Sequence, residues 1–234
     1  MSATYLSGAQ ASTAIARLAL LRTARGKALW FALALGLLPV LLGWAWRADG
    51  TAPLEAWDRL LVTFTMVMGI IAPILVASSL SDEIDDRTAA YLWSRAVPRW
   101  SVVTGKLLAM APIVAAPLLL GLTLAWIVIG PGAIGTLTFA RTIGAFALGA
   151  VGASALSALI ATLAPRFATP LAVGWMLIID TTFAGFDISL RAITVSYGTR
   201  AIARGSTDPV GAISLLVLTA LALAWSIRRV KRIE

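Results

Sequence analysis

The chain has 234 residues, of which 59% are hydrophobic and only 13% are charged, and its mean hydropathy is +0.90. A soluble domain carries about 25% charged residues, so this sequence has too little solvating surface for one. Nineteen Lys and Arg residues against 11 Asp and Glu give a net charge of +8. The sequence contains neither Cys nor His, which excludes disulfides, Cys/His metal sites, thiol catalysis and histidine-based acid–base catalysis.

Six apolar windows follow one another along the chain, each about 20 residues long and so able to cross roughly 30 Å of hydrocarbon as a helix. They are apolar all round rather than along one helical face, which is typical of membrane spans. The predicted fold is therefore an all-α membrane protein with a single transmembrane domain over residues 1–234. The predicted spans are residues 28–46, 60–80, 107–129, 142–165, 167–186 and 209–227.

The connections between these windows differ in their content of Lys and Arg. Thirteen of the 19 basic residues lie on the side that holds both termini, and the other six lie on the opposite side. Because basic connections stay in the cytoplasm, both termini are predicted to be cytoplasmic. The excess positive charge then faces anionic lipid, and no nucleic-acid partner is expected.

A cationic, helix-compatible stretch, residues 12–27, precedes the first span. We expect an amphipathic elbow helix that lies in the membrane interface and leads into the bilayer. Arg22 shares a helical face with Ile15 and Leu18, so its side chain has to reach out of an apolar face towards water. The alternative is a basic flank that only orients the first span.

The fourth span carries small residues at every fourth position, which form one smooth stripe along a helix. Such stripes let two helix backbones approach closely in a membrane, where lipid offers no hydrophobic drive for association. The stripe predicts a helix-packing face, either against another span of this chain or against a second copy. Its members are Ala145, Gly149, Ala153, Ser157 and Ala161.

Candidate catalytic groups are few. Asp180 is the only charged residue within the six windows, and Asp187 follows seven residues later beyond Gly185. An aspartyl dyad would need both carboxylates on one helix, and Gly185 between them disfavours a continuous helix. We therefore interpret Asp180 either as an interfacial residue at the outer end of the fifth span or, with Asp187, as part of a substrate path. Neither Gly26-Lys27 nor Gly105-Lys106 fits a phosphate-binding P-loop, so any ATP, with its Mg²⁺, is expected on another chain.

The connection between the second and third spans is the most structured polar stretch. Four acidic residues open it and Arg95 comes near its end, before Pro98, which is the charge order that complements a helix dipole. A partly apolar stripe at helical spacing runs along it, consisting of Ile84, Thr88, Tyr91, Leu92 and Arg95. This predicts a short cytoplasmic helix that docks into a groove on a partner, or else one that rests on lipid headgroups.

The same connection resembles a known signature. Glu83, Arg87-Thr88, Leu92, Val97-Pro98-Arg99 and Gly105-Lys106 are similar to the motif after the second span in permease subunits of type-2 ATP-binding-cassette (ABC) exporters. The usual form has Gly where this chain has Arg87, and Arg99 here directly follows Pro98.

The resemblance implies a non-catalytic subunit of an ATP-driven exporter, multi-pass in the plasma membrane (the bacterial inner membrane), which pairs with a second permease copy or a homologous permease. A separate ABC ATPase would bind ATP and Mg²⁺, so no cofactor is expected in this chain. A coupling helix would dock into the ATPase, and Arg99 and Lys106 would anchor its return to the membrane. The residues expected to couple to this partner are Glu83, Ile84, Arg87, Thr88, Tyr91, Leu92, Arg95, Pro98, Arg99 and Lys106.

Two other functions fit the same residues. A membrane anchor or assembly subunit would use this connection to hold an ATPase or another partner without moving a substrate. A channel or secondary transporter would work without any ATPase. For an exporter, the apolar spans with few charges favour an amphipathic or lipid-like cargo.

Overall fold

The computed structural model describes residues 7–80, 98–186, 189–206 and 209–231, and within them it contains helices and no strands. α1 (Gly8–Ala24) is joined by a tight turn to α2 (Lys27–Ala48), and α3 (Pro53–Ala72) continues into a π-helical segment, η1 (Pro73–Ala77). The remaining elements are α6 (Arg99–Ile129), α7 (Pro131–Ile134), α8 (Thr136–Leu163), η2 (Pro165–Phe167), α9 (Ala168–Gly174), η3 (Trp175–Asp180), α10 (Thr181–Phe183), η4 (Ser189–Ile193), α11 (Val195–Ala203) and α12 (Val210–Lys231).

Within the described residues, five helices are long and apolar enough to cross a membrane, and they correspond to the first, second, third, fourth and sixth predicted spans. The fifth predicted span is built differently. α9, the π-helical η3 and α10 follow one another over residues 168–183, a run shorter than the other five. Its crossing of the membrane therefore stays a prediction.

Several helices begin before the apolar windows that predicted them. α3 starts at Pro53 rather than at residue 60, and α6 starts at Arg99 rather than at residue 107. Hydropathy marks only the part of a helix that lies in hydrocarbon, whereas backbone hydrogen bonding continues into the interface. Pro53 at the first helical position and Glu55 in the first turn favour the earlier start of α3.

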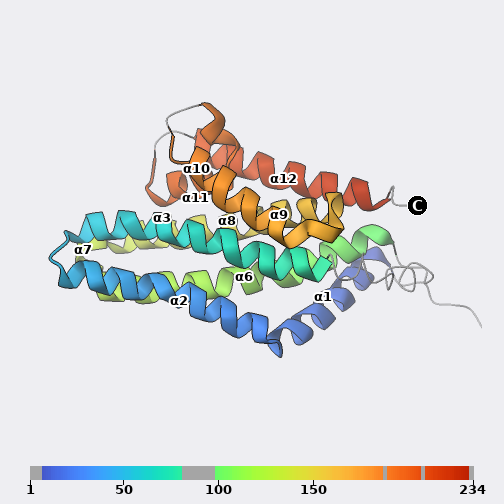
Figure 1. Cartoon of the computed structure of the whole chain (residues 1–234), viewed down its shortest axis with the longest axis horizontal. Coiled ribbons are helices and arrows are strands. Elements are labelled where there is room, and N and C mark those ends of the chain that lie inside the picture. Colours follow the sequence, from blue (N-terminus) through green and yellow to red (C-terminus); the bar gives the residue numbers. More distant parts are fainter. Residues whose placement is uncertain (1–6, 81–97, 187–188, 207–208, 232–234) are drawn as a thin grey trace, which may run out of the picture.

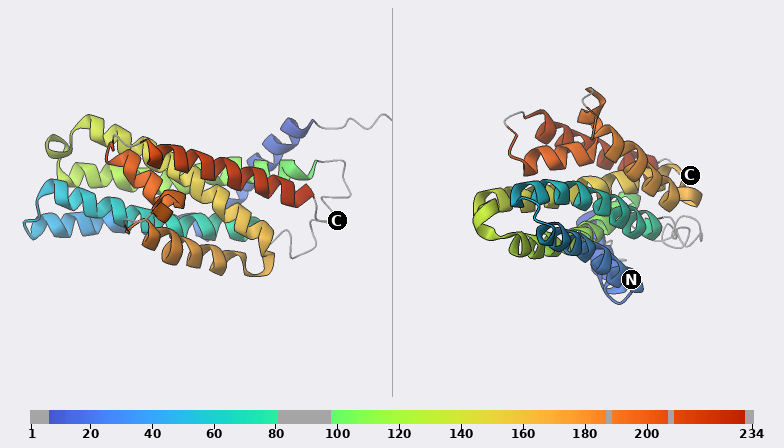
Figure 2. Two further views of the ribbon diagram at one scale, coloured as in Figure 1. Left: turned by 90° about the horizontal axis from the view of Figure 1, so that it is seen from above. Right: turned by 60° about the vertical axis from the view of Figure 1, so that its left-hand side comes forward.

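The long helices run up and down, so their ends gather at two poles of an elongated bundle (Figures 1 and 2). The name elbow pole is used for the end of the bundle that holds α1, the end of the α3–η1 helix, the start of α6 and the end of α12. We call the turn pole the end that holds the α2–α3 connection, α7 and α11. Both ends of the described chain therefore lie at the elbow pole.

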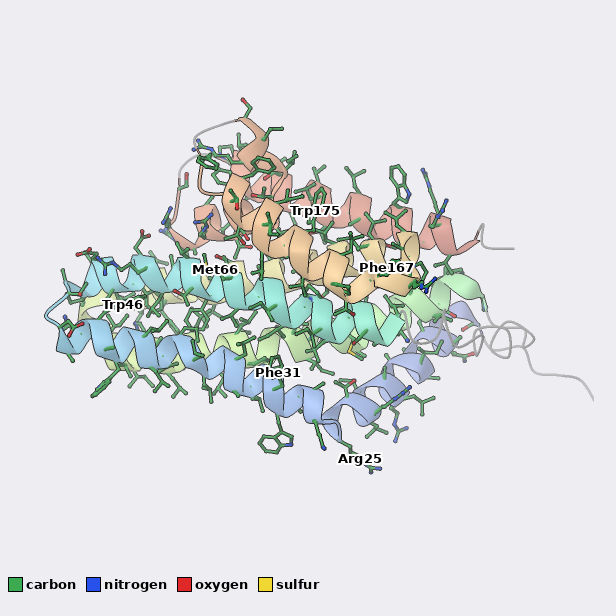
Figure 3. All side chains as sticks on the ribbon, viewed as in Figure 1. Arg25, Phe31, Trp46, Met66, Phe167 and Trp175 are labelled. Atoms are coloured by element: carbon green, nitrogen blue, oxygen red, sulfur yellow. The ribbon has the colours of Figure 1, made fainter. Side chains whose placement is uncertain are left out.

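Close backbone contacts and aromatic packing hold the bundle together. A Cβ atom on Gly36 of α2 would lie 2.7 Å from the Pro117 carbonyl oxygen of α6, so these helices touch through backbone atoms. Phe64 and Phe146 are fully buried and pack edge to face, with ring centroids 6.1 Å apart. On the outer surface large apolar side chains are exposed, and those of α2 point away from the bundle (Figure 3), as expected for a surface that lies against lipid.

Candidate functional site

Most of the predicted coupling residues lie outside the described part of the chain, and what the structure describes is the flanks of that segment. The residues concerned are Glu83, Ile84, Arg87, Thr88, Tyr91, Leu92 and Arg95. Pro98 forms the N-cap position of α6, and its carbonyl oxygen accepts hydrogen bonds from the Ser101 N–H at 2.9 Å and the Ser101 hydroxyl at 2.6 Å. Arg99 is the first residue of α6, so the return into the long helix starts directly at the predicted anchor.

Lys106 joins the two flanks of that segment. Its side chain is only 4% exposed, and its Nζ donates a hydrogen bond to the Ser79 carbonyl oxygen at the end of the α3–η1 helix. Because Lys106 lies in the second turn of α6, this bond ties the helix before residues 81–97 to the helix after them. Burying a cation is costly unless it is hydrogen-bonded, and the Ser79 carbonyl oxygen supplies an acceptor here.

The elbow helix α1 packs directly on α6. Ser12 is buried, and its hydroxyl oxygen lies 2.9 Å from that of Thr104. A Cβ atom on Gly105 would lie 2.6 Å from the Ser12 carbonyl oxygen, so only glycine permits this approach of α1 to α6. From the sequence, Gly105 was assigned only to the motif, and its contact with α1 was not predicted. The one signal for this contact is that small residues occur on two segments far apart in the chain.

A cavity of about 340 Å³ opens between α1, the start of α2, the end of the α3–η1 helix and α6. We call it the elbow cavity. Its wall combines apolar residues with Arg22 of α1 and Lys106 of α6, and no acidic residue lies among its described lining. A second hollow, of about 640 Å³, lies on the outer surface between α6, α8 and α12, and its lining is almost entirely apolar.

The turn pole holds the other candidate group, Asp180, which is only 1% exposed. Its carboxylate accepts the backbone N–H groups of Val195 at 2.7 Å and Ser196 at 2.9 Å, which are the first two residues of α11. A carboxylate at this position satisfies two unpaired donors and complements the helix dipole. Asp180 therefore ties the fifth predicted span to α11. Asp187 lies outside the described residues, so a shared substrate path stays a prediction.

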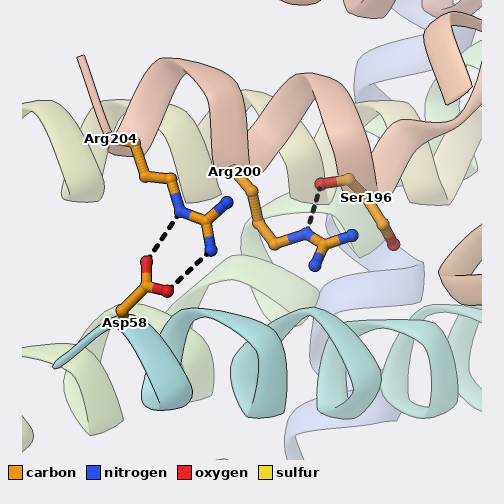
Figure 4. A network of polar contacts seen from close by, with 4 residues as sticks. All are labelled: Asp58, Ser196, Arg200 and Arg204. Atoms are coloured by element: carbon orange, nitrogen blue, oxygen red, sulfur yellow. Dashed lines mark hydrogen bonds and ion pairs between the residues drawn. The ribbon is translucent and has the colours of Figure 1, made fainter. Parts of the chain in front are cut away.

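Further charges at this pole were not anticipated from the sequence. Arg204, the C-cap residue of α11, binds Asp58 of α3 through two hydrogen bonds, of 2.7 and 2.9 Å (Figure 4). One turn earlier, Arg200 is 8% exposed and donates its Nε–H to the Ser196 carbonyl oxygen at 3.3 Å. The Arg200 Nη2 is buried and has no hydrogen-bond partner among the described residues. Nothing in the local sequence signals these pairings, because the partners lie on different helices.

All five members of the small-residue stripe on α8 are buried within this chain. Gly149 lies against the Thr199 side chain of α11, and Gly152, next to the stripe, lies against the Thr219 hydroxyl of α12. The stripe therefore faces helices of the same chain here, which is one of the two arrangements that the sequence left open.

A bundle of long apolar helices with a basic elbow pole defines a multi-pass helical membrane protein. The model of a family described as ABC-2 family transporter protein matches residues 1–205, and the chain belongs to this family. No individually curated protein matches the chain significantly. Members of this family are membrane transport components, generally not catalytic themselves, that work with an ABC ATPase. The chain is accordingly a membrane permease.

Proposed function

We propose that this permease is the membrane-spanning subunit of an ATP-driven exporter, and that residues 81–97, whose two flanks lie at the elbow pole, bind the ATPase. The observation that supports the proposal most strongly is the grouping of these elements at one end of the bundle. α1, both flanks of residues 81–97 and the end of α12 gather at one pole, so a cytoplasmic partner meets all of them together. Leu80 and Pro98 bracket the proposed coupling segment there.

The distribution of charge supports a cytoplasmic elbow pole. None of the four acidic residues in the described part of the chain lies on the elements of the elbow pole: Asp49, Glu55 and Asp58 lie at the α2–α3 connection or in the first turns of α3, and Asp180 binds the start of α11. The elbow pole carries an excess of Lys and Arg on α1, at the start of α2, in η2 and at the end of α12. This asymmetry is the one that retains basic segments on the cytoplasmic side.

The mechanism follows from how the coupling segment is mounted. Lys106 links α6 to the helix that ends before residues 81–97, so a displacement of this segment moves two long helices together. α6 is continuous over 31 residues and can carry that displacement across the bilayer. ATP binding and hydrolysis in the partner then shift the bundle between two arrangements, which is all that coupled export requires.

The remaining parts of the proposal concern the partners. ATP and Mg²⁺ are bound by the ATPase, and two permease copies, or this chain and a homologous permease, enclose the export path in the bacterial inner membrane. The apolar interior of the bundle favours an amphipathic or lipid-like cargo. Among the described residues the buried charged side chains are Lys106, Asp180 and Arg200, which is few for a path that conducts small ions.

The test is a charge deletion in the coupling segment with a matched control. Glu83→Ala together with Arg87→Ala removes an acid–base pair spaced four residues apart. We expect the double variant to lose co-purification with the cognate ATPase and the change in ATP hydrolysis that the assembled permease imposes. Glu55→Ala with Arg59→Ala removes a pair of the same types and spacing, a 2.6 Å ion pair at the turn pole, and should leave both readouts unchanged.

An ATPase that binds the Glu83/Arg87 variant and responds to it as it does to the wild-type chain would refute the coupling assignment. Equal loss in both double variants would show that the effect is not specific to residues 81–97.

A further inference from the structure

The elbow cavity lies where a lipid headgroup and the first part of its acyl chain would meet the protein. It opens at the elbow pole between α1 and the long helices. Ile15 and Leu18 line it from α1, and Leu75 and Met110 line it from the α3–η1 helix and α6. The same lining includes Arg22, one turn beyond Leu18. The elbow cavity is thus lined both by an apolar wall and by a cationic side chain.

This arrangement accounts for the unusual pattern of α1. Arg22 shares the face of Ile15 and Leu18, which makes a poor amphipathic helix if that face simply meets lipid tails. In the structure all three residues line the elbow cavity. An apolar strip that ends in a guanidinium group is complementary to a phospholipid, in which the acyl chain is joined through glycerol to a phosphate.

Charge favours an anionic occupant. Arg22 and Lys106 both line the cavity, and the described lining contains no Asp or Glu. None of the acidic residues in the described part of the chain lies on the elements that define the elbow pole. Arg22 is exposed on α1 and can present its planar fork to two phosphate oxygens at once. Basic pockets between membrane helices on the cytoplasmic side are suited to anionic headgroups.

We propose that the elbow cavity binds an anionic phospholipid, with the Arg22 guanidinium on the phosphodiester and the acyl chain along the apolar wall formed by Ile15, Leu18, Leu75 and Met110. A lipid in this position bridges α1 to α6 beside the Lys106–Ser79 junction. It therefore fills the space between the elbow and the helices that flank residues 81–97.

The test measures lipid retention by the full-length permease, without its ATPase, so a failure here leaves the proposed function untouched. The protein is delipidated in neutral detergent and titrated with phosphatidylglycerol or phosphatidylcholine, and bound lipid is counted by native mass spectrometry. We expect one tightly held phosphatidylglycerol and no comparable phosphatidylcholine. Arg22→Gln should weaken the phosphatidylglycerol affinity by about tenfold, because a charge-assisted contact is lost. Arg22→Lys, which keeps the charge but not the fork, should have an intermediate effect.

Arg25→Gln is the matched control. Arg25 lies on the same basic segment, does not line the cavity, and points away from the bundle (Figure 3). Its substitution should leave lipid retention unchanged. Equal retention by the wild-type chain and Arg22→Gln would overturn the proposal, and so would equal losses in the Arg22 and Arg25 variants. Displacement of phosphatidylglycerol by millimolar inorganic phosphate alone would show an anion site rather than a lipid site, which also overturns it.

Discussion

The two poles of the bundle are held together by different interactions. At the turn pole, charges meet charges or backbone dipoles: Asp58 binds Arg204, and Asp180 accepts two N–H groups of α11. At the elbow pole the described residues supply basic side chains but no acidic ones, and contact depends on close backbone approach at Gly105 and on the Lys106–Ser79 bond.

This difference indicates which pole depends more on groups from outside the chain. At the turn pole Glu55, Asp58 and Asp180 each bind a partner within the chain, whereas the excess of cations at the elbow pole attracts anions from elsewhere. The elbow pole is where we place both the lipid and the ATPase. Substitutions that remove contacts at one pole and leave those of the other in place therefore test whether the two poles are stabilised independently.

The largest effect is expected from Asp180→Ala at the turn pole. The change leaves the Val195 and Ser196 N–H groups buried without an acceptor, and each such loss costs about 1–3 kcal/mol. We expect destabilisation of about 3 kcal/mol, seen as a lower midpoint of thermal unfolding in detergent. Asp180→Asn keeps one acceptor oxygen and should cost about half as much.

Asp49→Ala is the control for this experiment, because Asp49 is exposed at the same pole and its loss should change stability by less than about 0.5 kcal/mol. A change no larger in Asp180→Ala than in Asp49→Ala would show that the link between η3 and α11 does not stabilise this pole.

The sequence predicted the parts of the fold that depend on local composition. Five apolar windows correspond to helices of spanning length, because hydrophobicity summed over about 20 residues decides whether a segment enters a membrane. The fifth window was harder, since η3 is π-helical and the whole run is short. Hydropathy cannot distinguish a regular helix from one whose hydrogen-bond pattern shifts by a residue.

The contacts of the candidate site were less predictable, for a physical reason. Asp58 and Arg204 are 146 residues apart, and Ser12 and Thr104 are 92 apart. Such pairs form only when the helices are already packed against one another, so no local sequence pattern predicts them. The sequence identified Asp180 as exceptional because it is charged within an apolar window, but not that it caps α11. Of the predicted coupling residues, those from Glu83 to Arg95 lie outside the described part of the chain.

The second prediction concerns a substitution that separates α1 from α6 at the elbow pole. Gly105→Leu places side-chain atoms where the Ser12 carbonyl oxygen lies, so α1 should separate from α6. The chain has no Cys, which permits a direct readout with Ser12→Cys and Thr104→Cys, whose native hydroxyl oxygens are 2.9 Å apart. We expect rapid disulfide formation in this pair and a decrease of about tenfold in its rate when Gly105→Leu is added.

The matched control is Gly144→Leu on α8, where a Cβ atom would meet nothing within 4 Å. It should leave cross-linking unchanged. Cross-linking that proceeds equally fast in the Gly105 variant would mean that the elbow does not depend on this glycine. The midpoint of unfolding should change less in Gly105→Leu than in Asp180→Ala, because α1 lies outside the buried core.

The smallest effect is expected from the ion pair between Asp58 and Arg204. Its side chains are 53% and 46% exposed, so water screens the attraction, and such pairs contribute about 0.2–1 kcal/mol. A double-mutant cycle with Asp58→Asn and Arg204→Gln in detergent should give a coupling energy of about 0.5 kcal/mol. The same cycle is then measured with the protein in lipid bilayers. A coupling energy that stays small in bilayers supports a turn pole that is open to water, whereas one well above 1 kcal/mol would mean that lipid or another subunit covers the pair and excludes water from it.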